Sequence, residues 1–253
     1  MRIRTVEGIP EIQAGDDIAS ILDSLDSPGA DDVVVIASTI VSKAEGRSRR
    51  LEEFTPSERA NDIARRLCER SGEEKDPRFA QAVLEESTEL LIEDPFLLTV
   101  THFGHIGVNA GIDRTNVGDG SDILLLPEDP IESARRISTH LNNRPPVIIS
   151  DTSGRPFRYG QRGVAIGWAN IPATRDWRGA TDRQGRTLHV TVEAIVDELA
   201  AAANLVTGES DEGRPVAYVE DWLPADLDGG DRLFRAVESD FVRQALRGWR
   251  YDS

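Results

Sequence analysis

The 253-residue sequence predicts an α+β fold in which mixed sheets carry flanking helices. Continuous apolar runs, which are typical of buried strands, alternate irregularly with segments whose apolar residues recur at helical spacing. A hydrophobic content of 39% is enough for a real core. The length suits one large domain or two closely joined lobes, and we expect two intertwined lobes.

Local start and stop signals place the elements of the first half. Asp16-Asp17 precede apolar residues at helical spacing, and Asp31-Asp32 precede the apolar run 33–37. Pro56-Ser57-Glu58 is a typical helix start. In order, we expect an interrupted strand at 6–13, a helix at 16–25, a strand at 33–37, helices at 56–68 and 78–88, a strand at 96–101, a glycine-rich loop at 104–120 and a strand at 123–126.

The second half carries similar signals. Pro130 begins a helix, and Gly208 ends the clearest helical pattern. We expect a helix at 130–141, strands at 146–151 and 163–168, a helix at 189–206, a strand at 215–219 and an amphipathic helix at 231–249. Residues 1–225 are predicted to form the catalytic domain, in one or two lobes, and residues 226–253 a C-terminal helical extension.

Charge and cysteine content exclude several classes of protein. The 29 basic and 45 acidic residues give a net charge of −16, which argues against nucleic acid or an anionic membrane as a partner, because phosphates attract Lys and Arg. No apolar run could span a membrane and the N-terminus lacks a signal-peptide core, so we expect a cytoplasmic protein. The single cysteine, Cys68, excludes an internal disulfide and every CxxC motif.

The familiar nucleotide and hydrolase motifs are absent. No Gly-Lys-Ser/Thr of a P-loop occurs, no Gly-x-Gly-x-x-Gly follows a strand, and no Gly-x-Ser-x-Gly elbow is present. The histidines lack the spacing of a zinc finger or a metzincin. A nucleotide site in this chain would therefore be of a non-P-loop type.

Two polar clusters lie just beyond predicted strands, where open sheets place ligand contacts. In residues 38–43, the hydroxyls of Ser38 and Thr39 and the ammonium of Lys43 suit a polyphosphate; the alternative is a polar strand end with a solvated lysine. In residues 108–117, Asp113 and Asn116 follow small residues that let a ligand approach closely; the alternative is an ordinary turn.

Two further clusters supply hard oxygen ligands. Asp151 followed by Thr152 at a strand end is a frequent Mg²⁺ arrangement, but the aspartate can equally be a helix N-cap. Carboxylates in residues 207–214 oppose the dipole of the preceding helix; a bound cation would offset this conflict, and an exposed salt-adapted loop would tolerate it. Together the clusters are the inventory for divalent metals that hold a nucleoside triphosphate. The candidate ligands are Asp113, Asp151, Thr152 and Glu209.

In these same segments the chain resembles the coenzyme F420-0:L-glutamate ligase family, the gamma-glutamyl ligases of the deazaflavin cofactor. The resemblance runs from about residue 5 to about residue 222. Its most specific segments are Ala-Gly-Ile-Asp at 110–113 and Asp-Thr-Ser-Gly-Arg-Pro-Phe-Arg at 151–158. Further matching segments are 8–10, 37–39, 42–43, 162–167 and 208–209.

The resemblance implies a set of site residues. The implied catalytic residues are Lys43, Asp113 and Asp151, and the implied divalent-metal ligands are Asp113, Asp151, Thr152 and Glu209. The implied GTP contacts are Ile9, Pro10, Glu11, Ile12, Ser38, Thr39, Lys43, Asn116, Thr207, Gly208, Glu209, Ser210, Asp211, Glu212, Gly213 and Arg214. Many relatives carry an amide at the position of Glu209, so its carboxylate is a departure. Two divalent cations (Mg²⁺ or Mn²⁺), K⁺ and a homodimer are also implied.

The activity implied by the resemblance is GTP-dependent addition of L-glutamate to coenzyme F420-0, which builds a gamma-linked polyglutamate tail. A substrate carboxylate attacks the γ-phosphoryl group of GTP, and the amine of glutamate then displaces phosphate from the acyl phosphate. Arg155, Arg158 and Arg162 either clamp negative groups of the substrates or pair with the acidic surface. A metal-dependent GTP phosphohydrolase and a non-catalytic GTP-binding module stay open as alternatives.

The charged residues predict a fold that depends on salt. Lys43 and Lys75 are the only lysines, whereas Asp and Glu together number 45. Molar salt screens the repulsion within such a surface, so we expect a halophilic protein whose melting temperature rises between low salt and multimolar KCl. Thermal melts followed by circular dichroism measure this rise. An unchanged melting temperature would contradict the prediction.

Overall fold

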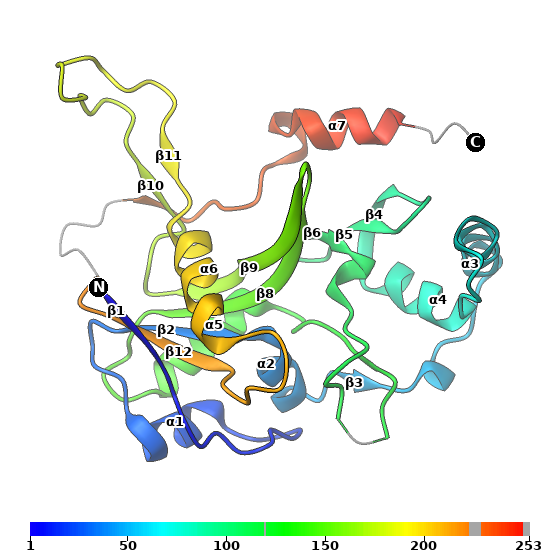
Figure 1. The fold of residues 1–253 in the computed structure, drawn as a ribbon, viewed down its shortest axis with the longest axis horizontal. Helices are drawn as coiled ribbons and strands as arrows, with labels where there is room; N and C mark the ends of the chain where they lie inside the picture. Colours follow the sequence, from blue (N-terminus) through cyan, green and yellow to red (C-terminus); the bar gives the residue numbers. More distant parts are fainter. Residues whose placement is uncertain (119, 223–228, 250–253) are drawn as a thin grey trace. The chain divides into compact units, whose positions relative to one another are not determined.

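The computed structural model describes residues 1–118, 120–222 and 229–249. The chain forms two compact units and passes between them repeatedly (Figure 1). Unit 1 comprises Met1–Ala44 and Asp129–Leu233, and unit 2 comprises Glu45–Glu128 and Phe234–Ser253. Helices together with a mixed sheet confirm the predicted α+β class. The domain boundary predicted between residues 225 and 226 lies outside the described residues.

Unit 1 is built around a five-stranded sheet (Figure 1). Its order is β1 (Arg2–Thr5), β12 (Val216–Glu220), β2 (Val33–Ala37), β8 (Val147–Arg155) and β9 (Arg158–Ala169). Strands β2 and β8 run parallel, and every other neighbouring pair is antiparallel. Residues 33–36 are at most 2% exposed, because β2 is the central strand and both of its faces are covered. This burial accounts for its continuous apolar sequence.

The helices of unit 1 are α1 (Ile18–Asp26), α2 (Ser38–Ala44), α5 (Pro130–His140) and α6 (Ile195–Thr207). Helix α1 begins after Asp17, whose carboxylate accepts hydrogen bonds from the main-chain N–H groups of Ala19 and Ser20. Helix α5 begins with Pro130 behind the N-cap Asp129. Helix α2 begins directly where β2 ends, so the interpretation of residues 38–43 as a polar strand end was wrong.

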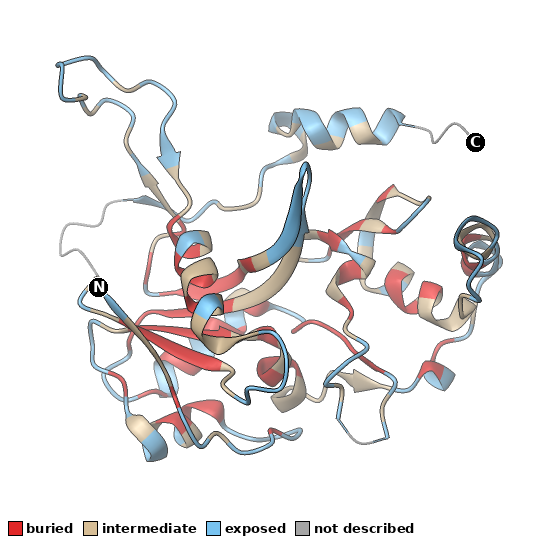
Figure 2. Cartoon of the chain, in the orientation of Figure 1, coloured by how far each residue is buried: buried red, intermediate tan, exposed pale blue. Residues whose placement is uncertain are grey.

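Strands β8 and β9 form a long hairpin whose inner half is buried and whose tip is exposed (Figure 2). Both strands extend beyond the predicted limits of 146–151 and 163–168, because main-chain pairing continues where apolar side chains stop. A Cβ atom at Gly163 would lie 2.6 Å from the carbonyl oxygen of Ala200 in α6. Glycine therefore lets β9 pack directly on the backbone of this helix.

A side chain of α6 strengthens the same contact. The carboxylate of Asp197 accepts a hydrogen bond from the main-chain N–H of Ala165 in β9, at 2.9 Å. Burial raises the pKa of Asp197, and this hydrogen bond acts against the rise. Helix and strand are thus joined by a backbone approach and by a side-chain hydrogen bond.

A three-stranded sheet also belongs to unit 1. Its order is β11 (Val192–Glu193), β10 (Thr174–Asp176) and β13 (Gly229–Gly230). The helix expected at 189–206 therefore begins only at Ile195. Glu193 pairs with Arg175 in the sheet, and its carboxylate accepts a hydrogen bond from the indole of Trp177 at 2.9 Å. Strand pairing of this kind overrides the local helical pattern.

Unit 2 combines short strands with two packed helices. The strands are β4 (Ser87–Ile92), β5 (Leu98–Thr101) and β6 (Ile106–Val108) in one sheet, and β3 (Ser48–Arg49) with β7 (Ile123–Leu124) in another. The helices are α3 (Glu58–Ser71) and α4 (Pro77–Glu85), with the 3₁₀ turns η1 (Leu51–Glu53) and η2 (Asn109–Gly111). Ile63, Val83, Leu97 and Ile123 are buried together in the core of this unit.

His105 lies inside the core of unit 2. Its ring stacks on Phe103, with ring centroids 6.4 Å apart, and meets Phe234 edge-on at 6.0 Å. Burial lowers the pKa of His105 to about 4. The imidazole is therefore neutral at physiological pH and packs as an aromatic side chain.

Three element predictions were wrong in their limits. No strand forms at 6–13, where Gly8 has a positive φ of 79° and residues 6–13 carry no regular structure. The helix expected at 78–88 ends at Glu85, and β4 follows it. The loop expected at 104–120 contains β6 and η2. In the second and third cases, pairing of β4 and β6 with β5 decides where the strands form.

The C-terminal helix is shorter than the predicted 231–249. Helix α7 (Phe241–Gly248) follows a single 3₁₀ turn, η3 (Val237–Ser239). Arg243 and Arg247 of α7 both pair with Glu89 of β4, each at 2.5 Å. The side chain of Arg243 is 12% exposed, so this pair is shielded from water and one carboxylate anchors the helix within unit 2.

No helix in the described ranges is long and apolar enough to cross a membrane.

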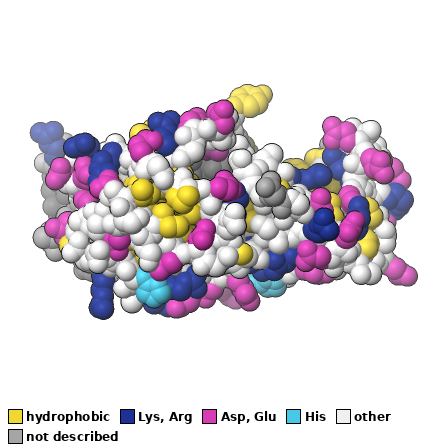
Figure 3. Space-filling view, turned by 90° about the horizontal axis from the view of Figure 1, so that it is seen from below, with side chains coloured by type: hydrophobic (Ala, Val, Ile, Leu, Met, Phe, Trp, Pro, Cys, Tyr) yellow, Lys and Arg dark blue, Asp and Glu magenta, His cyan; other side chains and the backbone are white. Residues whose placement is uncertain are grey.

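Acidic and basic side chains are interspersed on the face seen in Figure 3. Many arginines there and elsewhere form exposed ion pairs, such as Arg65 with Glu69 and Arg178 with Asp176. Each exposed pair contributes only about 0–1 kcal/mol, so these pairs do not remove the need for salt screening.

Gly163→Ala is expected to destabilise unit 1, because the added methyl group would meet the carbonyl group of Ala200. Overpacking of this kind costs about 1–3 kcal/mol. Gly154→Ala in the same hairpin is the matched control, since a Cβ atom there meets nothing within 4 Å. Denaturant unfolding of both variants measures the difference. Wild-type stability in Gly163→Ala would contradict the close packing of β9 on α6.

Candidate functional site

The parallel pair β2 and β8 brings two predicted site residues together. Ala37 pairs with Ser150 in the sheet, so the residues that follow them, Ser38 and Asp151, lie at the same edge. The Ser38 hydroxyl donates a hydrogen bond to Oδ1 of Asp151 at 3.3 Å. Asp151 lies within β8 and not at a helix start, which excludes the N-cap alternative. The carboxyl ends of parallel strands are where α/β sheets place ligands.

Lys43 is paired and largely buried. Its ammonium lies 2.5 Å from Oε1 of Glu11, and the Lys43 side chain is 11% exposed, against 71% for Glu11. The alternative of a solvated lysine is therefore wrong. Glu11 belongs to the predicted GTP contacts at residues 9–12, which lie in an irregular segment where only Ile12 is buried. Two predicted contacts of the same ligand thus meet each other.

Asp151 and Thr152 contact different elements, because neighbouring side chains of a strand point to opposite faces. Thr152 donates to both carboxylate oxygens of Glu209, at 3.1 and 3.3 Å. Asn204, in the last turn of α6, donates to Oε1 of Glu209 at 2.7 Å. The predicted oxygen donors of unit 1 therefore form two pairs, Ser38 with Asp151 and Thr152 with Glu209.

The loop after α6 folds around its own carboxylate. Gly208 has a φ of 80°, and a Cβ atom there would overlap the carboxylate of Glu212. The main-chain N–H of Ser210 donates to Oε2 of Glu212 at 2.9 Å, and this bond lowers the pKa of Glu212. In residues 208–212, the main-chain N–H of Ser210 therefore already holds one anionic group.

Arg214 ends this loop with an unsatisfied donor. Its Nε is buried and has no hydrogen-bond partner among the described residues. A buried N–H without a partner costs about 1–3 kcal/mol, so such a group calls for a ligand or ordered water. Arg214 belongs to the GTP contacts that the resemblance implies, and an anionic oxygen would satisfy its donor.

Asp113 and Asn116 belong to unit 2. Asp113 bridges to Leu124, and its Oδ1 accepts hydrogen bonds from the main-chain N–H and the hydroxyl of Thr115, at 3.2 and 3.0 Å. Asn116 has a positive φ of 55°. These are the local roles that aspartate and asparagine take in turns. The predicted metal and GTP contacts at these two residues stay predictions.

The donor chemistry of unit 1 suits hard cations. Within residues 1–118, 120–222 and 229–249, no three His, Cys, Asp or Glu side chains converge. Asp151, Thr152 and Glu209 nevertheless supply carboxylate and hydroxyl oxygens, which are the ligands that Mg²⁺ and Mn²⁺ prefer. The residues present therefore fit divalent cations in kind, with room for further oxygens from a ligand.

Sequence reasoning missed Asn204 and the pairing of Glu11. Asn204 lies one turn before the end of α6, and an amide at that position is the only local signal for its contact with Glu209.

Arg155, Arg158 and Arg162 make no ion pair within the described residues. The alternative that these arginines pair with acidic surface groups is therefore not observed there.

The F420-0:Gamma-glutamyl ligase family matches residues 8–221 of the chain. The chain belongs to this family. Proteins named Coenzyme F420:L-glutamate ligase from Natronomonas pharaonis and Halorubrum lacusprofundi are each 62% identical to it over 252 residues, covering 100% of this chain and 98% and 100% of theirs. One of the same name from Archaeoglobus fulgidus is 48% identical over 246 residues, covering 96% of each chain.

Membership in the gamma-glutamyl ligase family confirms the resemblance drawn from the motifs. The chain is accordingly an amide-bond-forming ligase, as predicted. The matched range includes the pairs Ser38–Asp151 and Thr152–Glu209. The similarity to proteins of halophilic archaea agrees with the acidic, lysine-poor composition.

Glu11→Gln is expected to strengthen the binding of inorganic triphosphate about tenfold, because the polyanion would no longer have to displace a carboxylate from Lys43. Isothermal titration calorimetry with the full chain measures this affinity. Glu7→Gln is the matched control, since Glu7 is exposed and accepts only from Thr5 in the described structure. An affinity equal to that of wild type would show that Glu11 and triphosphate do not compete.

Proposed function

We propose that this ligase joins L-glutamate to coenzyme F420-0 at the expense of GTP and extends a gamma-linked tail. The family assignment and the printed names of the relatives support these substrates. The observation that carries the proposal is the set of polar side chains that follow the parallel ends of β2 and β8, where Ser38 meets Asp151 on one face of β8 and Thr152 meets Glu209 on the other. There, an ammonium (Lys43), two hydroxyls (Ser38, Thr152) and two carboxylates (Asp151, Glu209) are held by short contacts.

The proposed reaction needs no nucleophile from the protein. A carboxylate oxygen of the F420-0 substrate forms a bond to the γ-phosphorus of GTP, and the bridging P–O bond breaks with its electron pair on GDP. The amine of L-glutamate then attacks the acyl carbon, phosphate leaves with the electron pair of the C–O bond, and the nitrogen loses a proton to solvent. Positioning and charge stabilisation are then the tasks of the site.

We assign roles in the first step to groups of unit 1. The ammonium of Lys43 attracts the oxygens of the transferred phosphoryl group once Glu11 has released it. The buried Nε of Arg214 and the main-chain N–H of Ser210 hold further phosphate oxygens. In both places the protein carboxylate now bound there, Glu11 or Glu212, gives way to a phosphate.

We propose Asp113, Asp151, Thr152 and Glu209 as ligands of two divalent cations, Mg²⁺ or Mn²⁺. The division of the unit 1 donors into two pairs supports two ions rather than one. Bound divalent cations would neutralise charge that develops on the phosphoryl oxygens. A K⁺ requirement, a homodimer and a cytoplasmic location complete the proposal, and they rest on the family resemblance alone.

Asp151→Asn is expected to lower GDP release in the presence of F420-0 and L-glutamate by at least a hundredfold, because the variant loses the negative charge with which Asp151 would hold a divalent cation. Asp31→Asn is the matched control, since Asp31 is an exposed carboxylate of the same unit. Coupled detection of GDP with varied Mg²⁺ measures both variants. Full activity of Asp151→Asn would contradict the proposed role.

The same assay separates the alternatives. Dependence of phosphate release on both F420-0 and L-glutamate supports the ligase reaction. Phosphate release from GTP without either substrate would identify a phosphohydrolase. Binding of GTP with no turnover under any condition would identify a non-catalytic module. Each outcome is read from one set of mixtures, with and without each substrate.

A further inference from the structure

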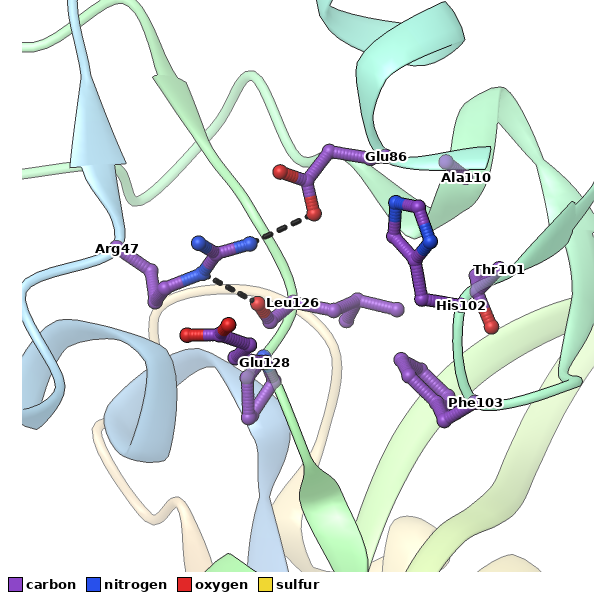
Figure 4. A pocket seen from close by; sticks show the side chains of 9 residues that line it. Arg47, Glu86, Thr101, His102, Phe103, Ala110, Leu126 and Glu128 are labelled. Carbon is purple, nitrogen blue, oxygen red and sulfur yellow. Dashed lines mark hydrogen bonds and ion pairs between the residues drawn. The ribbon is translucent and has the colours of Figure 1, made fainter. Parts of the chain in front are cut away.

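Unit 2 holds a cavity that none of the proposed GTP contacts lines (Figure 4). Its volume is about 150 Å³. Pockets for drug-sized ligands measure roughly 300–1,000 Å³, so this cavity is too small for a guanine nucleotide or a deazaflavin. It has the size needed for a free amino acid. All of its lining residues belong to unit 2.

A guanidinium is fixed in the wall of this cavity. The side chain of Arg47 is 14% exposed; its Nε donates to the main-chain oxygen of Leu126 at 2.9 Å and its Nη2 donates to Glu86 at 2.6 Å. Nη1 makes no hydrogen bond to any described residue (Figure 4). A planar guanidinium held on two sides presents its remaining N–H groups in a fixed direction, which is the geometry that a carboxylate recognises.

Hydrogen-bond acceptors complete the lining. Glu128 is exposed, and its carboxylate makes no ion pair or hydrogen bond within the described residues. Nε2 of His102 lies 2.7 Å from the main-chain oxygen of Glu85. Because a carbonyl oxygen only accepts, Nε2 of His102 is the donor in this contact. The ring of Phe103 adds an apolar wall.

The charges of the lining select the kind of ligand. One guanidinium and two carboxylates, those of Glu86 and Glu128, face the cavity. Because Glu86 is already paired with Arg47, Glu128 is the carboxylate of the lining that would repel a simple anion, whereas a simple cation would leave Nη1 of Arg47 without an acceptor. A zwitterion satisfies both ends, since its carboxylate can accept from Arg47 while its ammonium donates to Glu128.

We propose that this cavity binds the head group of a free α-amino acid, and that this amino acid is the amine donor of the ligase, L-glutamate. The α-carboxylate accepts hydrogen bonds from Nη1 of Arg47, and the α-ammonium donates to the carboxylate of Glu128. The identity of the amino acid rests on the proposed function. The preference for a zwitterion rests only on the lining.

Isothermal titration calorimetry of the full chain, with and without GDP, tests the proposal with two ligands. L-Glutamate carries the ammonium, and glutarate is the same diacid without it. Wild type is expected to bind L-glutamate at least tenfold more tightly than glutarate. Glu128→Gln is expected to weaken L-glutamate binding at least tenfold and to leave glutarate no weaker. Glu74→Gln, an exposed carboxylate of the same unit, is expected to match wild type.

Arg47→Lys provides a second variant, because it keeps the charge and loses the planar fork. It is expected to weaken L-glutamate and glutarate alike, while a thermal melt reports whether the contacts to Leu126 and Glu86 still support the fold. Equal affinity of wild type and Glu128→Gln for L-glutamate overturns the proposal. Equal affinity of wild type for the two ligands also overturns it.

The failure of this proposal is distinct from the failure of the proposed function. A chain that releases GDP in the full ligase mixture but binds no L-glutamate, with or without GDP, overturns the assignment of the cavity and leaves the ligase reaction intact. A chain that binds L-glutamate with the expected losses but never turns over GTP overturns the GTP-dependent reaction and supports the cavity.

Discussion

The close approach of β9 to the backbone of α6 is the constraint on which the proposed site in unit 1 depends. Gly163 leaves no room for a Cβ atom beside Ala200, so strand and helix are in backbone contact. Thr152 pairs with Gly163 across the hairpin. The loop that leaves α6 therefore arrives beside Thr152, and Glu209 reaches its hydroxyl. One glycine thus sets the distance between two segments that carry oxygen ligands.

The groups of unit 1 that we propose to bind phosphate already contact carboxylates of the protein itself. Glu11 neutralises the buried ammonium of Lys43, and Glu212 accepts from the main-chain N–H of Ser210. A buried charge without a partner is costly, so Glu11 stabilises the chain by pairing with the largely buried Lys43. In the proposed function, polyphosphate binding is an exchange of anions, and its affinity is the difference between two favourable contacts.

In unit 2, carboxylates orient arginine side chains. Glu89 binds both Arg243 and Arg247 and so joins the last helix to the first strand of its sheet. Glu86, three residues earlier, orients Arg47 toward a small cavity. In each case a carboxylate fixes the direction of an arginine side chain. A lysine could not replace it, because its ammonium lacks the planar fork of N–H donors that the guanidinium presents. The arginine-rich composition therefore has structural consequences in unit 2.

Local sequence signals determined much of the secondary structure. The run 33–37 is apolar throughout because both faces of β2 are covered, and Asp17 and Pro130 begin helices through their own side chains. Such features depend on neighbours in sequence and can be recognised there. The motifs around Asp113 and Asp151 likewise sufficed to indicate the family, which the match over residues 8–221 confirms.

The contacts of the proposed site were decided by tertiary structure. Lys43 meets Glu11 across 32 positions, Thr152 meets Glu209 across 57, and Ser38 meets Asp151 across 113. The late start of α6 and the length of the β8–β9 hairpin also depend on remote pairing. Sequence therefore determined which chemical groups are present. Only the packed chain decided which of them meet, because close packing and main-chain pairing act between segments that no local pattern connects.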